Sequence, residues 1–204
     1  GLYCPAGNFF IDPMKPVARA VVTHAHADHA RSGSGHYDVA AAGMGLMRER
    51  LGDAAAIDAH GYGETFRIGA VTVSLHPAGH VLGSAQIAVE AKGLRIVASG
   101  DYKRRRDPTC APFEPVRCDV FITEATFGLP VFRHPDDTNE IGKLLSSLAA
   151  FPERAHLVGA YALGKAQRVI KRLREEGYDR PIYIHGALER LCRLYEEEGI
   201  DLGP

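Results

Sequence analysis

The chain has 204 residues, of which 46% are hydrophobic and 24% are charged. These values are ordinary for a globular protein and exclude a low-complexity or collagen-like chain. The formal net charge is -1, so no global basic field indicates a polyanion partner, and any site for one must be local.

The four cysteines lack CxxC spacing, which predicts reduced thiols in a cytoplasmic protein rather than a disulfide framework. No apolar run approaches transmembrane length and no signal peptide is visible, so we expect no membrane association. The chain begins at Gly1 without methionine and ends at Pro204 just after a predicted helix, and we expect both ends to be trimmed.

A run of metal-ligand side chains follows the predicted strand 19–23. It reads His24-Ala25-His26-Ala27-Asp28-His29. The small alanine spacers allow the loop to curl so that several side chains meet at one point. Imidazole nitrogens and carboxylate oxygens suit zinc or a similar divalent ion. The run therefore predicts a metal site in which His24 and His26 hold one ion while Asp28 and His29 face a second.

Two later strands also end in ligand-type side chains. His80 follows the predicted strand 71–76 and is the third imidazole expected at the first ion, with His76 as the weaker alternative. Asp101 follows the second strand of a predicted hairpin, 94–99. A carboxylate at this position can bridge two ions, and two ions about 4 Å apart can clamp the oxygens of a phosphodiester.

Two further acids stand at strand ends. Asp12 follows the strand 9–11, where it can accept the second N–H of a ligating histidine or simply form an Asp-Pro turn. Glu124 follows the predicted buried strand 118–123. The polar strand ends together predict a single edge at which the sheets deliver their functional side chains.

A basic run, Lys103-Arg104-Arg105-Arg106, comes directly after Asp101. Charge runs usually form solvated faces. Beside a metal-ligand loop, this one is also a candidate grip for the phosphates of a nucleic acid. Both interpretations remain open at this point.

The second half of the chain changes in pattern. A helix is predicted to open near Asp136, because Asp137 and Glu140 have capping-box spacing. Strands and helices are then predicted to alternate over 155–160, 164–176, 181–185 and 187–198. This β-α-β-α order favours a parallel sheet and thus a second or inserted domain of α/β type over 136–204, after a first domain over 1–135.

These motifs resemble those of the metallo-β-lactamase superfamily, which carries the HxHxDH run followed in order by a histidine and an aspartate. Three further segments, 79–84, 124–128 and 163–167, look like motifs of its β-CASP nucleases, which include Artemis and the pre-mRNA 3′-end cleavage nuclease. Over nearly its whole length the chain resembles the bacterial ligase-associated DNA exonucleases, a group also labelled mRNA 3′-end processing factors.

The resemblance implies an αββα sandwich with two divalent metal ions at one sheet edge, zinc before manganese or iron. Residues 1–135 would form the first part of the metallo-β-lactamase-like domain, and 136–204 the beginning of an inserted β-CASP-like α/β domain. By motif match, the first zinc would be held by one histidine set, the second ion by Asp28 and His29, and Asp101 would lie between them. The first set is His24, His26 and His80.

The resemblance also assigns roles to Asp12, as support of a ligating histidine, and to Glu124, as an acid that pairs with a later histidine. The family carries two further histidine motifs after the inserted domain, one of which supplies a ligand to the second metal. No match to them precedes Pro204. We therefore expect either a chain that lacks its C-terminal part or an incomplete second site, with the final ligand and the general acid beyond Pro204.

The function that these features predict is a metal-dependent phosphodiesterase on nucleic acid, most specifically a DNA exonuclease in DNA repair. A metal-activated water would attack the phosphorus, with Asp28 and Asp101 orienting it. DNA is expected before RNA as partner, and family resemblance suggests a DNA ligase or helicase complex. The alternatives are an RNA 3′-end processing nuclease, a hydrolase of small esters, thioesters or lactones, and a non-catalytic partner in such a complex.

Overall fold

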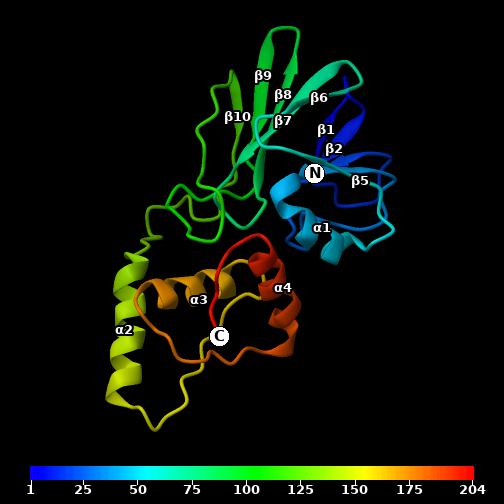
Figure 1. Cartoon of the computed structure of the whole chain (residues 1–204). Coiled ribbons are helices and arrows are strands. Elements are labelled where there is room, and N and C mark those ends of the chain that lie inside the picture. The colour runs from blue at the N-terminus through cyan, green and yellow to red at the C-terminus, as the bar shows by residue number, and fades with distance from the viewer. The chain divides into compact units, whose positions relative to one another are not determined.

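The computed structural model describes all 204 residues and divides them into two compact units, Gly1–Glu124 and Ala125–Pro204 (Figure 1). The boundary between the units falls earlier in the chain than the domain boundary that the sequence suggests.

The first unit contains two five-stranded sheets. The first sheet has the order β1-β2-β3-β4-β5. Its first two strands are antiparallel and the remaining pairs are parallel. The strands are β1 Leu2–Cys4, β2 Phe9–Ile11, β3 Ala20–Val21, β4 Tyr37–Ala40 and β5 Ile57–His60.

The second sheet has the order β10-β9-β8-β7-β6. Strands β6 to β9 form an antiparallel meander, and β10 returns to pair in parallel with β9. The strands are β6 Thr65–Ile68, β7 Val71–Pro77, β8 Ala85–Ala91, β9 Leu94–Ala98 and β10 Val120–Ile122. The predicted hairpin across Lys92-Gly93 is confirmed, with both residues in the left-handed region that such a turn requires.

The two sheets pack face to face through one apolar core. Because side chains alternate along a strand, every second residue of each sheet points to this interior. Among the buried core residues are Phe9, Ile11, Val21 and Ala40 from the first sheet and Ile68, Val71, Val73, Leu75, Ala85, Ile87 and Ala98 from the second. Removal of this apolar area from water fixes the two sheets against each other and holds their strand ends at a common edge.

Different elements lie against the two outer sides. A 3-10 turn, Ala41–Gly43, leads into helix α1, Met44–Leu51, which contacts β4 and buries Leu46, Met47 and Leu51. The second sheet is instead lined by the loop after β9, since Gln86 of β8 donates to the carbonyl of Glu114 at 2.7 Å. Within residues 1–124 the structure thus has one α-helix, and the second helical layer of an αββα sandwich is not formed there.

The prediction that residues 118–123 form a buried strand is wrong in part. A strand forms over Val120–Ile122, but all three of its residues are exposed, at 45, 41 and 40%. The reason is that β10 is the edge strand of its sheet, with a neighbour on one side only. An apolar run in the sequence does not distinguish an edge strand from a central one.

A buried ion-pair network ties three strands of the first sheet together. Asp38 is fully buried and accepts both a fork from Arg19, at 2.7 and 2.9 Å, and a bond from Nε2 of His60 at 2.9 Å. His36 and Asp58 lie beside it, so that these three side chains form a cluster with the spacing of metal ligands. Both oxygens of Asp38 are engaged, and the Arg19 guanidinium repels a cation, so we assign the network a structural role.

We expect Asp38→Asn to destabilise the protein by about 3 kcal/mol, because it leaves the Arg19 charge without its buried partner. For a chain of this size, the melting temperature should fall by roughly 6–12 °C. Thermal or urea denaturation measures the change. Asp58→Asn is the matched control, since Asp58 is exposed and bonds only His36. Equal melting temperatures for the two variants would contradict the assignment.

The second unit contains three helices, α2 Asp137–Ala150, α3 Lys165–Glu175 and α4 Gly186–Glu197. Asp136, rather than Asp137, caps the first of them by accepting from the amide of Thr138 at 2.9 Å. Apolar residues of α3 and α4 form the interior of this unit. Its buried side chains include Ile170, Leu173, Cys192, Leu194 and Tyr195.

The predicted strands 155–160 and 181–185 are not formed, so the expected parallel sheet is absent from residues 125–204. Both segments are irregular, and neither has a hydrogen-bonded neighbour strand. Their apolar side chains are consequently exposed, with Leu157 at 97% and Tyr183 at 95%. An alternating apolar pattern reports a tendency to extend, whereas a strand also needs a partner.

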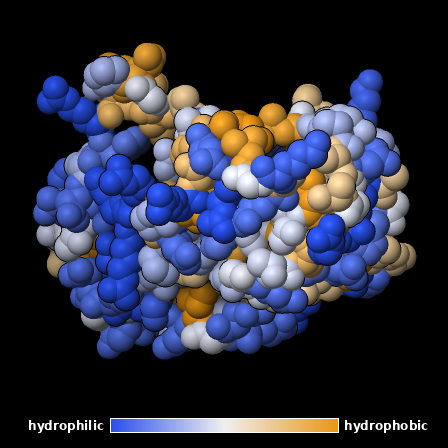
Figure 2. All heavy atoms as spheres, turned by 90° about the horizontal axis from the view of Figure 1, so that it is seen from above, coloured by the Kyte–Doolittle hydropathy of each residue, from blue (hydrophilic) through white to orange (hydrophobic).

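No helix in the structure is both long and apolar enough to cross a bilayer. Figure 2 shows one face of the molecule, which is mostly hydrophilic, with apolar side chains gathered in a few patches. The exposed large apolar residues include Leu129, Val131 and Tyr161.

Candidate metal centre

The loop that carries the ligand run follows strand β3 of the first sheet. Backbone hydrogen bonds within the loop hold it in a tight turn. The amides of His29 and Ala30 both donate to the carbonyl of His26, at 3.1 and 2.8 Å. His24 is fully buried, whereas His26 and His29 are half-buried. The run thus combines a rigid inner histidine with others that solvent can reach.

Four donor atoms from three separate segments meet at one point. Nδ1 of His26 lies 2.9 Å from Nε2 of His24 and 3.3 Å from Nε2 of His80. Oδ2 of Asp101 lies 3.6 Å from Nε2 of His80 and 3.9 Å from Nε2 of His24. Ligands around a tetrahedral zinc ion stand about 3.4 Å apart, since each lies about 2.0–2.1 Å from the metal. The donor set therefore fits one such ion.

The other oxygen of Asp101 faces a second group of donors. Oδ1 of Asp101 lies 3.4 Å from Nε2 of His29, and the same nitrogen lies 3.7 Å from Oδ2 of Asp28. The Asp28 side chain is 74% exposed, so this group is open to solvent. Asp101 consequently stands between two donor sets, one on each of its oxygens, which is the position that a bridging carboxylate occupies.

Asp12 binds Nδ1 of His29 and not Nε2, which is the nitrogen that faces Asp28 and Asp101. Its Oδ2 is 2.7 Å from Nδ1 of His29, and it accepts from Oγ1 of Thr23 at 2.6 Å, while Oδ1 accepts from the amide of Thr23 at 2.8 Å. Asp12 is one of three non-glycine residues with a positive φ, at 45°. The surrounding bonds hold this unfavourable conformation. The proton on Nδ1 of His29 then leaves Nε2 as the acceptor that points to the site.

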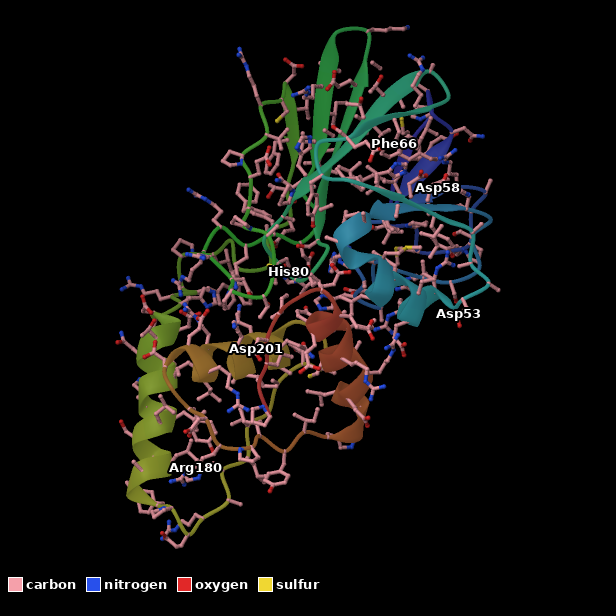
Figure 3. The ribbon with its side chains drawn as sticks, in the orientation of Figure 1. Asp53, Asp58, Phe66, His80, Arg180 and Asp201 are labelled. Atoms are coloured by element: carbon pink, nitrogen blue, oxygen red, sulfur yellow. The ribbon has the colours of Figure 1, made fainter.

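His80 is positioned by the loop between β7 and β8, where Figure 3 shows it. Oγ of Ser84 accepts from the amides of His80 and Val81, at 3.0 and 3.2 Å. Gly83 has φ of 73°, and a Cβ there would lie 2.1 Å from the Cα of Gly43. Only glycine allows this contact, because any side chain would collide with backbone. The loop is therefore pressed against the turn before α1, and His80 is held in place.

Burial and neighbouring charges lower the pKa of two histidines of the site, His24 and His80. Burial is the largest cause that lowers the pKa of His24 well below its usual value, and the charges of His29, His26 and His80 add to it. Burial and then His26 lower the pKa of His80 to about 4. Both imidazoles are thus neutral at pH 7, the form that binds metal.

His29 and Asp101 shift in the other direction. Burial acts to lower the pKa of His29, but the hydrogen bond to Asp12 and the charges of Asp12, Asp101 and Asp28 outweigh it, so the pKa is raised. Burial raises the pKa of Asp101, and the charges of Glu124 and Asp28 add to the rise, against the opposing charge of His29. Several carboxylates lie close together around one histidine, and their negative charges favour a bound cation.

A hollow of about 450 Å³ opens beside Asp101, and we call it the His29 hollow. Its polar lining includes Asp12, Asp28, His29, Arg31, Asp101 and Glu124. Glu124 is half-buried, and its amide donates to Oγ of Ser99 at 3.3 Å. The acid at the end of β10 thus lies by the donor sets, as its place at a strand end predicts, and its charge acts on both His80 and Asp101.

The basic run divides into two parts. Nζ of Lys103 is 2.6 Å from Oδ2 of Asp107, which is buried and also accepts from Thr109. Lys103 is therefore engaged within its own loop. The arginines that follow it, Arg104, Arg105 and Arg106, are exposed and line neither of the two hollows found near the ligand loop.

Other candidates lie outside the centre. Nε2 of His76 is 3.0 Å from Oγ of Ser74, which supports the choice of His80 over it. His185 caps α4 by accepting from the amide of Ala187. The residue that the sequence analysis missed is Thr23, whose hydroxyl lies within 2.6–3.4 Å of Asp12, His24 and His29. A hydroxyl directly before the ligand run was its only signal.

No family model matches the chain. The chain is 33% identical over 215 residues to a probable DNA ligase of Opitutus terrae, in a match that covers 100% of this chain and 20% of that protein. It is 34% identical over 149 residues to endoribonuclease YSH1 of Gibberella zeae, in a match that covers 68% of this chain and 18% of that protein. The chain belongs to the β-CASP branch of the metallo-β-lactamase superfamily.

Another curated relative of this β-CASP chain is cleavage and polyadenylation specificity factor 73 of Drosophila melanogaster, which is 32% identical over 124 residues, or 56% of this chain and 18% of that protein. The β-CASP chain spans about a fifth of the length of the curated relatives described here. It also resembles the crystal structure of a protein of unknown function from Enterococcus faecalis, with a TM-score of 0.60 at 12% identity, over 85% of this chain and 48% of that one. At such low identity, this similarity concerns the fold alone.

Proposed function

We propose that the chain is part of a metal-dependent phosphodiesterase that acts on nucleic acid. The observation that carries the proposal is the position of Asp101, whose two oxygens face two separate donor sets. Membership of the β-CASP branch supports it, since two relatives bear the name endoribonuclease or cleavage factor. The proposed fold is a metallo-β-lactamase sandwich over 1–135 with an inserted β-CASP-like domain beginning at 136.

Each residue has a role that follows from its place. His24, His26 and His80 would hold one divalent ion, zinc before manganese or iron, and Asp28 with His29 would hold a second. Asp101 would bridge them. The ions, when bound, would lower the pKa of a water molecule and offset charge on the phosphoryl oxygens. Asp28 and Asp101 would accept hydrogen bonds from that water and orient it.

Asp12 and Glu124 would act from outside the donor sets. Asp12 holds the tautomer of His29 through the bond to Nδ1, so that Nε2 stays available. Glu124 contributes negative charge beside Asp101 and His80, which favours a bound cation over an empty site. His24 excludes water from the inner side of the centre, because it is fully buried.

We propose DNA as the substrate and an exonuclease of DNA repair as the activity, in a cytoplasmic protein. The supporting observation is that the match to the probable DNA ligase covers all of this chain. An RNA 3′-end processing nuclease is the second candidate, favoured by the matches to endoribonuclease YSH1 and factor 73.

The test compares 5′-labelled single-stranded DNA and RNA of the same sequence with manganese or zinc present. We expect the DNA to shorten progressively from one end, and Asp28→Ala to slow its loss by more than about 100-fold, since even outer partners of a metal site cost about 10–100-fold. Asp53→Asn is the control, because Figure 3 shows Asp53 apart from His80.

Preferential loss of RNA would move the assignment to the second candidate. Turnover of a small ester with both nucleic acids intact would overturn the proposal in favour of an esterase. Equal rates for the parent and Asp28→Ala would overturn the proposed mechanism.

A further inference from the structure

The exposed arginines of the ligand loop and of α1 offer a place for an anion that neither the motifs nor the relatives point to. A second hollow, of about 440 Å³, lies beside the ligand loop, and we call it the Arg50 hollow. Its lining includes Met14, Ala27, Ala30, Arg31, Ser32 and Arg50. Arg31 and Met14 also line the His29 hollow, so the two hollows meet at these residues.

Both arginines are attached to the ligand loop by one nitrogen only. Nε of Arg31 donates to the carbonyl of Asp28 at 3.4 Å, and Nε of Arg50 donates to the carbonyl of Ala25 at 3.2 Å. Neither guanidinium pairs with a carboxylate, and both side chains are exposed. The terminal nitrogens of both guanidinium groups can therefore donate hydrogen bonds to a ligand.

Several other arginines of the chain, unlike Arg31 and Arg50, are engaged in ion pairs. Arg19, Arg95 and Arg172 each bind a carboxylate. Even in the basic run, Lys103 is paired with Asp107. The two guanidinium groups beside the ligand loop thus carry positive charge without an ion-pair partner. A planar guanidinium with two terminal donors matches phosphate geometry better than a lysine does.

We infer that Arg31 and Arg50 bind the phosphates of a single nucleic acid strand and lead it from the Arg50 hollow to Asp101. Arg31, shared by both hollows, would hold the phosphate next to the reacting one, and Arg50 a phosphate farther along the strand. The inference rests on the proposed function, because it names the surface by which that substrate is held. It assigns this role to the ligand loop and α1 rather than to the basic run 103–106.

The test measures binding without cleavage. The affinity of the protein for a fluorescein-labelled single-stranded oligonucleotide is measured by anisotropy in EDTA over a series of potassium chloride concentrations. We expect Arg31→Gln and Arg50→Gln each to weaken binding by about tenfold, because each removes a charge-assisted bond. Each should also reduce the slope of log K against log salt by about 0.7, the value for one phosphate contact on a single strand.

Three comparisons make the result specific. Arg67→Gln is the matched control, since Arg67 on β6 is exposed, forms no ion pair and lines neither hollow. Arg31→Lys keeps the charge and should keep the slope while it loses several-fold in affinity. Arg104→Gln represents the basic run, and a larger slope change there than in Arg31→Gln would overturn the assignment.

The failures of the two proposals are distinguishable. If the parent cleaves nucleic acid but the Arg31 and Arg50 variants bind with unchanged affinity and slope, the inference is wrong and the proposed function stands. If these variants lose bound metal while their binding is unchanged, the arginines only brace the loop, and the inference is again wrong. If the parent neither binds nor cleaves, both proposals fail.

Discussion

Asp101→Asn should lower phosphodiester cleavage by more than about 100-fold and reduce the metal content of the purified protein. Substitution of outer partners of a metal ligand costs about 10–100-fold in affinity or activity. Asp101 serves both donor sets, through Oδ2 toward His80 and His24 and through Oδ1 toward His29. An amide cannot bridge two cations as a carboxylate does, so we expect the loss to exceed that range.

The measurement pairs cleavage rates with metal analysis of the same samples. Asp53→Asn is the matched control, because it makes the same chemical change at an exposed carboxylate after α1. The far-ultraviolet spectra of the two variants should coincide, since the sheets pack through residues that neither variant touches. A variant Asp101→Asn that keeps both its metal and its rate would show that Asp101 is no bridge.

The convergence of these donor side chains was predictable from the sequence because each of them follows a strand. Periodicity identifies the strands, and the face-to-face packing of two sheets brings their ends to one edge. His80 and Asp101 are separated by a whole hairpin in sequence, yet their atoms lie 3.6 Å apart. The order of the motifs along the sequence predicted that His80 and Asp101 lie together, because no local pattern indicates how far apart they are.

What the sequence could not provide was the partner of each side chain. Lys103 reads as part of a basic run, but a buried acid four residues later binds it. Arg31 and Arg50 are too far apart in sequence to suggest a common surface. The same limit explains the second unit, where the apolar segments 155–160 and 181–185 have no neighbour strand and form no sheet. Helices close their hydrogen bonds locally, so α3 and α4 were predicted to within about two residues.

Lowering the pH from about 8 to about 6 should release metal from the His29 side of the centre before the His24 side. A histidine must lose its proton to bind metal. The raised pKa of His29 means that a proton competes for its nitrogen from neutral pH downward. Because burial lowers the pKa of His80 to about 4 and that of His24 also well below its usual value, protons do not compete there until the medium is much more acidic.

Metal content measured after dialysis at a series of pH values should thus fall in two steps, and the apparent affinity of the first site lost should fall by about tenfold per pH unit. Asp12→Asn tests whether protonation of His29 causes the first step, because it removes the hydrogen bond and the charge that raise the pKa of His29. In that variant the apparent affinity of the first site should begin to fall only at a lower pH, although the metal is bound more weakly throughout, whereas the second step should stay in place because His24 and His80 do not contact Asp12. A single step that Asp12→Asn leaves unmoved would mean that the two donor sets do not titrate separately.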